Sequence, residues 1–136
     1  MKKTVLITGG QGFVGRALVE RFNALGYSTI CADLNDQPLA GAAFAGVRFI
    51  KLDVRDKAAV IAACQGVDSV IHNASLVHTK HNRVADVWAV NLDGAKNILA
   101  ACEAHAIPAW CMCLRPRWCT KAKTFVAATK ACPIPN

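Results

Sequence analysis

Residues 8–15 read Thr-Gly-Gly-Gln-Gly-Phe-Val-Gly, a composition that could bind a phosphate group. This turn follows a β-rich run at residues 4–7 and opens a segment whose apolar residues recur at helical spacing. Gly9 permits a tight turn, Gly12 lets a diphosphate approach the backbone amides, and Gly15 lets the helix lie close to the sheet. The residues expected to bind the diphosphate are Gly9, Gln11, Gly12, Phe13, Val14 and Gly15.

An acidic residue stands where a dinucleotide site needs one. Asp33 closes the next predicted strand, residues 28–32, and lies 18 residues after Gly15. There its carboxylate can accept hydrogen bonds from the ribose hydroxyls of adenosine, and it would repel a 2′-phosphate. The sequence therefore predicts NAD rather than NADP, although Arg16 could still hold a phosphate. The alternative is that these glycines only form a turn.

The rest of the first hundred residues alternates strand and helix patterns with short loops. Strands are predicted at 47–52 and 67–72, and residues 34–46 are predicted to be a loop with a short helix. The helix after the glycine turn, a helix from Asp56 to residue 64 and one over about 82–105 would cover the sheet. In the first helix, the apolar residues that recur at helical spacing are Val14, Ala17, Leu18, Phe22 and Leu25. In the last helix, the residues expected to face inward are Val84, Val87, Trp88, Asn91, Ala95, Ile98, Leu99 and Cys102. This order predicts an α/β fold with a doubly wound parallel sheet of the Rossmann type, incomplete at its C-terminal side.

These segments together resemble the extended short-chain dehydrogenases/reductases over roughly residues 2–108. Residues 8–15 are similar to the family's cofactor fingerprint, and residues 91–98 resemble its Asn-x-x-Gly-x-x-Asn stretch. The resemblance implies that Asp53 and Val54 contact adenine, and that residues 72–75 pass under the nicotinamide ribose. It thereby adds Asn73, Ala74 and Ser75 to the expected cofactor site. Residues 75–78 lean toward the 3β-hydroxysteroid dehydrogenase-like branch rather than the sugar-nucleotide epimerases.

The family's catalytic Tyr-x-x-x-Lys pair has no counterpart here. In the family, the tyrosine exchanges a proton with the substrate oxygen and the lysine lowers the tyrosine pKa. The one tyrosine, Tyr27, precedes the second predicted strand, so no catalytic residue is predicted. The resemblance implies the NAD-binding portion of an oxidoreductase or epimerase that acts on a secondary alcohol of a sterol-like or nucleotide-sugar substrate. Such a portion, truncated before the substrate-binding region, would be inactive alone.

Several single residues have structural interpretations. His72 is expected to cap a buried strand, and Asn91 either steadies backbone near the site or bonds across helices. The remaining histidines, His78, His81 and His105, lack metal-ligand spacing and are expected at the surface. Cys31, Cys64 and Cys102 are expected in the core, so no metal site is predicted among them.

Composition divides the chain near Pro108. The 136 residues carry a formal net charge of +7, but residues 1–105 hold eleven basic and nine acidic residues. Residues 106–136 hold five basic residues, no acidic one and four of the seven cysteines. We therefore predict an NAD-binding domain at 1–108 and a basic tail at 109–136.

The chain lacks an apolar run of membrane-spanning length, so a soluble cytoplasmic protein is expected. Its expected partners are a small-molecule substrate and, in a homodimer, a second copy, but neither a membrane nor nucleic acid.

Three interpretations of the basic tail compete. Its cysteines could bind a metal but lack the Cys-x-x-Cys spacing of structural zinc, and its basic and Trp residues could bind nucleic acid. The third is a reading-frame error, because Trp-Cys and Met-Cys must be encoded with GTG across each junction. Reading one base earlier turns residues 109–114 into an apolar strand that can end in two serines, as the family's fifth strand does. We favour a frame-shifted stretch within 109–132, since Pro116 and its flanking arginines argue against a central strand. If residues 109–136 are encoded as printed, the sequence predicts a sheet of four strands.

The functional alternative to the enzyme is a non-catalytic dinucleotide-sensing or interaction module with a basic tail.

Overall fold

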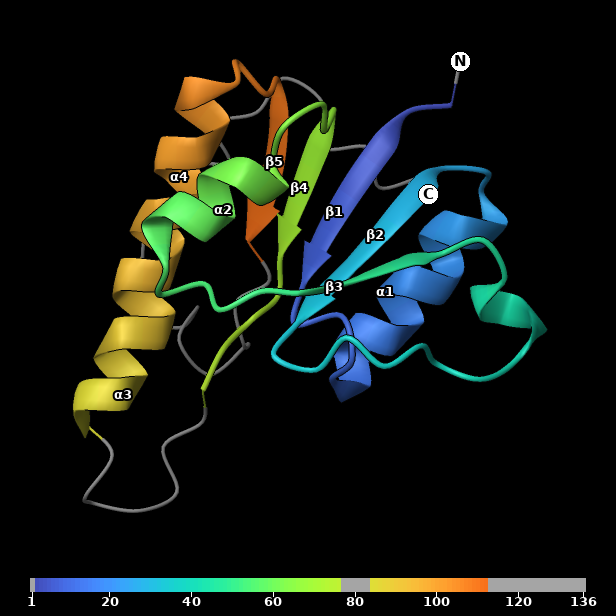
Figure 1. The fold of residues 1–136 in the computed structure, drawn as a ribbon, viewed down its shortest axis with the longest axis horizontal. Helices are drawn as coiled ribbons and strands as arrows, with labels where there is room; N and C mark the ends of the chain where they lie inside the picture. Colours follow the sequence, from blue (N-terminus) through green and yellow to red (C-terminus); the bar gives the residue numbers. More distant parts are fainter. Residues whose placement is uncertain (1, 77–83, 113–136) are drawn as a thin grey trace, which may run out of the picture.

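A five-stranded, all-parallel sheet forms the centre of the computed structural model, which describes residues 2–76 and 84–112. The strand order is β3-β2-β1-β4-β5. The strands are β1 (Thr4–Thr8), β2 (Ser28–Asp33), β3 (Arg48–Lys51), β4 (Ser69–His72) and β5 (Ala109–Met112). The chain moves outward from β1 through β2 to β3, then returns to the other side of β1 for β4 (Figure 1). The carboxyl ends of β1 and β4 are therefore neighbours where the strand order reverses, which is where open α/β sheets bind ligands.

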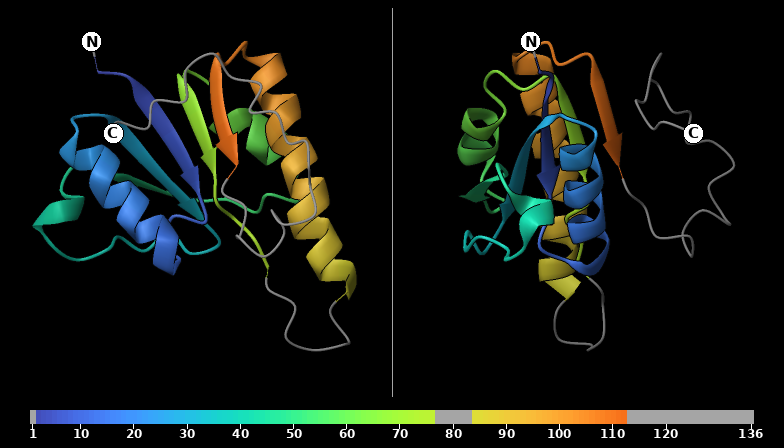
Figure 2. Two further views of the ribbon diagram at one scale, coloured as in Figure 1. Left: turned by 180° about the vertical axis from the view of Figure 1, so that it is seen from behind. Right: turned by 90° about the vertical axis from the view of Figure 1, so that its right-hand side faces the viewer.

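Helices cover both faces of the sheet. α1 (Phe13–Ala24) lies on one face, and α2 (Lys57–Ala63) and α4 (Gly94–Ala104) lie on the other (Figure 2). α4 continues a helical stretch that begins with α3 (Val84–Trp88) and passes through a π-helical turn, η3 (Ala89–Asp93). A single 3₁₀ turn, η1 (Ala42–Phe44), interrupts the connection between β2 and β3. The doubly wound α/β prediction is confirmed.

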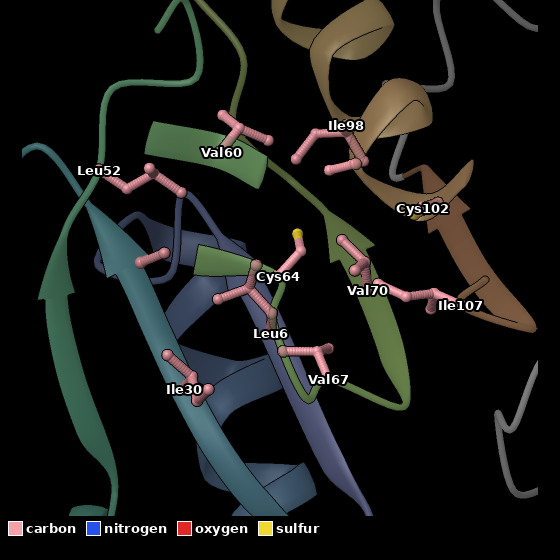
Figure 3. Packing of buried hydrophobic residues seen from close by; sticks show 12 residues of the cluster. Leu6, Ile30, Leu52, Val60, Cys64, Val67, Val70, Ile98, Cys102 and Ile107 are labelled. Atoms are coloured by element: carbon pink, nitrogen blue, oxygen red, sulfur yellow. The ribbon is translucent and has the colours of Figure 1, made fainter. Parts of the chain in front are cut away.

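The core forms two layers because side chains of β1 alternate across the sheet. Leu6 packs with Val60, Val70 and Ile98 under α2 and α4 (Figure 3). Val5 and Ile7 point the other way and pack with Val19 and Phe22 of α1. A central strand buried on both faces needs an apolar residue at every position, and β1 supplies one at its three central positions.

Local predictions for the first strands, the loop and α2 are confirmed. The loop at 34–46 contains the expected short helix, here η1. Asp56 caps α2, because its side chain accepts a hydrogen bond from the Ala59 amide at 3.1 Å. Cys31, Cys64 and Cys102 are buried as expected, and burial raises the pKa of each thiol to about 11.

The predicted inward face of the last helix is partly wrong, and the apolar pattern of α1 differs from the residues that α1 buries. In α1 the buried residues are Gly15, Val19 and Phe22, whereas Val14, Ala17 and Leu25 are exposed. Close packing at Gly15 decides which side of α1 faces the sheet. A pattern based on apolar side chains does not include glycine and so cannot indicate that side. In the last helical stretch the residues wrongly expected inside are Val84, Trp88, Asn91 and Leu99, all exposed. The π-helical turn changes the angular spacing there, so extrapolation at 3.6 residues per turn loses the face.

The expectation of a four-stranded sheet is also wrong. Ala109–Met112 forms β5 and pairs in parallel with β4, with Ile71 opposite Cys111. These four residues are apolar and contain no proline, so they suit a strand. The residues that argued against a strand, Arg115, Pro116 and Arg117, lie outside the described part of the chain. The boundary after Pro108 stays a prediction.

Among the described helices, none combines the length and the apolar character that crossing a bilayer requires.

Candidate functional site

The turn between β1 and α1 presents unpaired amides at the N-terminus of a 12-residue helix. Gly9 has φ +63°, and its carbonyl accepts from the Gly12 amide at 3.1 Å, which closes the turn. α1 has no side-chain cap and no acidic residue in its first turn. Within residues 2–76 and 84–112, no acceptor pairs with the amides of Phe13, Val14 or Gly15. Such a terminus attracts an anion.

Each glycine of the turn has a distinct steric role. A Cβ on Gly9 would lie 2.8 Å from the backbone of Ala74, so the turn and the end of β4 touch through backbone. A Cβ on Gly15 would collide with the carbonyl oxygen of Gly9 and lie 2.7 Å from the Cα of Gly10, so the first turn of α1 packs directly on the glycine turn. A Cβ on Gly12 would meet only the Gly9 carbonyl, at 3.3 Å, and otherwise points into open space. This opening beside unpaired amides fits a diphosphate.

Asp33 lies at the end of β2 and faces the turn. Its Oδ2 accepts from the Gln11 amide at 2.9 Å, and its Oδ1 accepts from the Leu34 amide at 2.7 Å. Each carboxylate oxygen keeps a further lone pair, so both could still accept from ribose hydroxyls. The fold therefore brings Asp33 to the glycine turn, and its binding to the ribose stays a prediction. Arg16, the alternative phosphate ligand, donates from Nε to the Gln11 carbonyl at 2.9 Å.

A buried hydroxyl joins the ends of β1 and β4. Thr8 Oγ1 accepts from the amides of Asn73 and Ala74, both at 3.2 Å, and lies 2.8 Å from His72 Nδ1. Since both lone pairs are used, the hydroxyl proton must be donated to Nδ1, which leaves the His72 proton on Nε2. His72 is 3% exposed, and burial lowers its pKa to about 4. Its expected role at the end of a buried strand is confirmed, and it is neutral there.

The residues that follow β4 contact the glycine turn. The Asn73 side chain donates from Nδ2 to the Gly9 carbonyl at 3.2 Å, so it holds the turn from the β4 side. Ala74 lies under Gly9, and Ser75 is exposed. A nicotinamide contact for these three residues stays a prediction.

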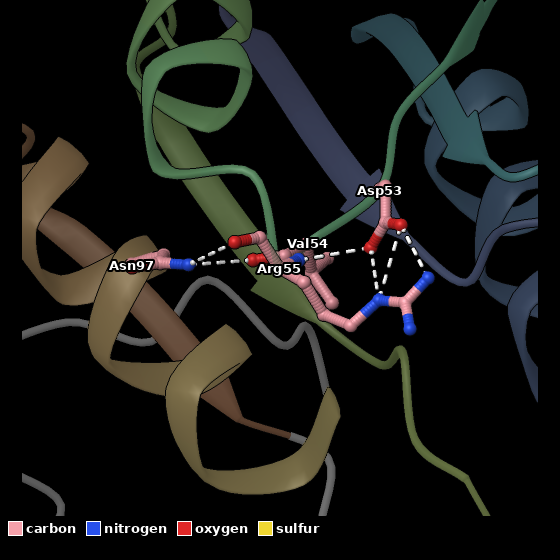
Figure 4. Close-up of polar contacts among 4 residues, drawn as sticks. All are labelled: Asp53, Val54, Arg55 and Asn97. Carbon is pink, nitrogen blue, oxygen red and sulfur yellow. Dashed lines mark hydrogen bonds and ion pairs between the residues drawn. The ribbon is translucent and has the colours of Figure 1, made fainter. Parts of the chain in front are cut away.

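Asp53 and Val54 follow β3 at the same edge of the sheet. Asp53 forms an ion pair with Arg55 at 2.7 Å, and hydrogen bonds from Arg55 lower the pKa of the Asp53 carboxyl (Figure 4). Val54 is buried, and a Cβ on Gly94 would lie 2.8 Å from its Cγ2. The Val54 carbonyl accepts from Asn97 Nδ2 at 2.9 Å (Figure 4). The contact of Asp53 and Val54 with adenine stays a prediction. Because the Val54 side chain is buried, Val54 would contact adenine mainly through its backbone.

Asn91 binds the backbone that leaves the site. Its Oδ1 accepts from the Leu76 amide at 2.8 Å, and its Nδ2 donates to the Leu76 carbonyl at 3.0 Å. Of its two expected roles, the structure shows the first, steadying backbone. His105 differs from its prediction: it is half-buried and its Nε2 lies 2.7 Å from the Ile61 carbonyl. His78 and His81 lie outside the described residues.

Two contributions to the site have no signal in the sequence. One is the side chain of Gln11, which bonds to the loop after β2, at the carbonyls of Asn35 and Gln37. The other is the Arg55 ion pair that occupies Asp53. Phe13 was expected for its amide, and its side chain is 97% exposed, so the backbone is its only described contribution.

No group of three or more metal-ligating side chains occurs among the described residues, which include Cys111 but not the other tail cysteines. Tyr27 packs edge-on against Phe22, with ring centroids 5.1 Å apart, just before β2 begins. It therefore lies at the opposite edge of the sheet from the glycine turn.

A sequence model described as the NAD dependent epimerase/dehydratase family matches residues 5–113. Among curated proteins, the chain is 36% identical over 111 residues to short-chain dehydrogenase/reductase family 42E member 1 of Bos taurus, covering 79% of this chain and 28% of that protein. It is 31% identical over 111 residues to 3beta-hydroxysteroid-dehydrogenase/decarboxylase isoform 2 of Arabidopsis thaliana, covering 71% of this chain and 19% of that protein. The chain thus spans less than a third of the length of either relative.

Solved structures share the fold. An Agrobacterium tumefaciens uronate dehydrogenase variant complexed with NAD aligns with a TM-score of 0.69 and 27% identity, covering 82% of this chain and 40% of that one. The Thermus thermophilus UDP-glucose 4-epimerase complex with NAD aligns with a TM-score of 0.64 and 32% identity, covering 79% and 36%.

Proposed function

The chain belongs to the NAD dependent epimerase/dehydratase family, and we propose that it is the NAD-binding portion of an oxidoreductase or epimerase. The observation that carries the proposal is the opening above Gly12, where unpaired amides of α1 face space that a side chain would otherwise fill. Asp33 lies beside the glycine turn, at the same edge of the sheet, where its carboxylate would bind the ribose. NAD is the cofactor of the family, and this chain's residues fit its diphosphate and ribose.

Each described residue has a binding role rather than a chemical one. The amides of Phe13, Val14 and Gly15 would bind the diphosphate, and Asp33 would orient the adenosine ribose. Thr8 and Asn73 hold the turn against the end of β4, and the nicotinamide side would lie over Ala74. When bound, NAD supplies a hydride acceptor for the oxidation of a secondary alcohol carbon.

We propose a sterol-like or nucleotide-sugar alcohol as the substrate of the whole protein. Support comes from the relatives, one a 3beta-hydroxysteroid-dehydrogenase/decarboxylase and another a UDP-glucose 4-epimerase. The described residues contain no Tyr-x-x-x-Lys pair, so we assign none of them to acid–base catalysis and expect the chain to be inactive alone.

Calorimetric titration of the 136-residue chain with NADH tests the proposal. Micromolar binding without turnover agrees with a cofactor-binding portion, and also with the alternative of a dinucleotide-sensing module. Absence of binding would contradict both and favour an interaction protein. A salt-sensitive complex with nucleic acid would favour a role for the basic tail.

We also propose that the protein forms a homodimer in the cytoplasm. Its support is the exposure of large apolar side chains on the α3–α4 stretch: Trp88 is 60% exposed, and Val84, Leu92 and Leu99 are also exposed. Light scattering should give a mass twice that of one chain, and the Trp88→Glu variant should have the mass of a single chain.

The proposed location in the cytoplasm is supported by free buried thiols at Cys31, Cys64 and Cys102, which suit a reducing compartment. Cell fractionation tests it.

The frame-shift hypothesis for residues 109–132 stays a proposal as well. Resequencing of the gene with intact mass and peptide mapping decides it. Codons that read cleanly as printed would defeat it.

A further inference from the structure

The side chain of Gln11 connects the glycine turn to the loop that follows β2. Its Nε2 donates to the Asn35 carbonyl at 2.7 Å and to the Gln37 carbonyl at 2.9 Å. Its Oε1 lies 3.4 Å from Asn35 Nδ2. Both protons of the Gln11 side-chain amide are therefore donated to one short segment, residues 35–37.

That segment, residues 35–37, has little else to hold it. It lies in a stretch without helix or strand between β2 and η1, and all three residues are exposed. One local bond, from the Gln37 amide to Asn35 Oδ1 at 3.1 Å, shapes it as a turn. Within the described residues, each hydrogen bond that joins residues 35–40 to another part of the chain ends on Gln11.

The backbone of Gln11 is itself fixed inside the site. Its amide donates to Asp33, and its carbonyl accepts from Arg16. A residue whose backbone bonds the ribose-side carboxylate therefore also positions residues 35–37 through its side chain.

The segment carries a second acidic residue. Asp36 lies between the two residues whose carbonyls Gln11 holds, three positions after Asp33. A phosphate on the 2′-hydroxyl would add about two negative charges there. Two carboxylates in a loop held in one place disfavour that phosphate, and Arg16, the nearby cation, is already bonded to the turn.

We propose that Gln11 is a specificity-determining residue: its side chain holds residues 35–37 beside Asp33 and so restricts the site to a dinucleotide with an unphosphorylated ribose. This role rests on the proposed function, because it concerns the same site. It adds a side-chain role to a residue expected to contribute its backbone. A loop released from Gln11 could carry Asp36 away and admit the phosphate.

α1 offers a matched control. Asn23, near the end of the helix, donates from Nδ2 to the carbonyls of Ala43 and Ala45 at 2.9 and 3.0 Å. Like Gln11, Asn23 donates two hydrogen bonds from its side-chain amide to backbone carbonyls of the β2–β3 connection, but it does so away from the glycine turn. Gln11→Met and Asn23→Leu each replace an amide by an apolar side chain of similar size.

Two measurements on the full chain test the proposal. The first is the rate of cleavage before Asp36 by the protease Asp-N, without any dinucleotide, with the cleavage position identified by mass. Gln11→Met should raise this rate by at least about fivefold because the segment is released, and Asn23→Leu should leave it unchanged. The second is the ratio of the dissociation constants for NADPH and NADH. That ratio should fall about tenfold in Gln11→Met, and by less than about twofold in Asn23→Leu.

The outcomes separate this proposal from the one on which it rests. Unchanged cleavage in Gln11→Met, or faster cleavage with an unchanged ratio, would overturn the role of Gln11 and leave NAD binding standing. Absence of NADH binding by the unaltered chain would overturn the proposed function and the specificity role together.

Discussion

Thr8 carries the most heavily used side-chain oxygen of the site. Its hydroxyl accepts from two amides after β4 and donates to His72 Nδ1, so one buried group fixes the carboxyl ends of β1 and β4 together. Protonation of His72 at Nδ1 would place a second hydrogen between the same two atoms. The neutral ring is therefore part of the site's geometry.

This arrangement predicts an acid-sensitive stability. The pKa of His72 is lowered in the fold to about 4, so between the unfolded value near 6.5 and that value the unfolded chain binds more protons. The free energy of unfolding should therefore fall as pH drops through this window, by up to about 1.4 kcal/mol per pH unit from this group. Denaturant titrations at a series of pH values measure it.

The matched variant is His72→Asn, which keeps an acceptor near the Thr8 hydroxyl but cannot titrate. Its unfolding free energy should depend less on pH between 4 and 6.5 than that of the unaltered chain. Parallel pH profiles would show that His72 does not carry the effect.

Two glycines of the turn separate folding from binding. Gly15→Ala places a methyl against the backbone of Gly9 and Gly10, which cannot yield as a side chain can, so the chain should lose about 3 kcal/mol of stability. Gly12→Ala meets only the Gly9 carbonyl, and should fold normally but bind NADH at least about tenfold more weakly. Thermal unfolding and calorimetry together check the pair. Equal effects on stability would contradict the assigned roles.

At the scale of elements, the helical stretch α3–η3–α4 joins the core to the site. α4 packs its buried face on the sheet, whereas the π-helical turn presents Asn91 to the backbone of Leu76. π-helical turns are often found at functional sites. Here the irregular turn holds the chain that leaves β4, next to the expected nicotinamide side.

Asn91→Leu should therefore release Leu76. Loss of two hydrogen bonds at an exposed position should lower the free energy of unfolding by about 1 kcal/mol. Asn91→Asp keeps the acceptor for the Leu76 amide and should lose less. Denaturant unfolding compares the two, and a neutral Asn91→Leu would show that the clamp contributes nothing to stability.

Much of this architecture could be predicted from the sequence because its signals are local. The glycine turn, Asp33 and the Asp56 cap each follow from neighbouring residue types, and each is found in the structure. The exposure of Trp88 could not be predicted, because the π-helical turn that follows it has no sequence signal. β5 ends at Met112, four residues before Pro116, so the proline that argues against a strand does not act on it. The Gln11 side chain bonds residues 24 and 26 positions away, which no periodicity indicates.

At the scale of the whole molecule, the fold collects its polar groups at one edge of the sheet. The glycine turn, Asp33, Asp53 and Asn73 each lie at or just after the carboxyl end of a strand, and the order of strands brings them together. Parallel strands share this edge, so a ligand there touches segments far apart in sequence. Binding should therefore stabilise the domain as a unit.

NADH at about 100 times its dissociation constant should raise the free energy of unfolding by about 2.7 kcal/mol. NADPH at the same concentration should raise it less, because Asp33 faces the ribose. Thermal unfolding with each dinucleotide measures both shifts. Equal shifts would contradict the predicted preference for NAD, and no shift would contradict binding.

A crystal structure of the chain soaked with NADH tests the central claim most directly. We expect the diphosphate within hydrogen-bonding distance of the amides of Phe13 and Val14, and the adenosine ribose hydroxyls on the carboxylate of Asp33. A dinucleotide bound elsewhere, or a ribose that leaves Asp33 bonded only to Gln11 and Leu34, would contradict it.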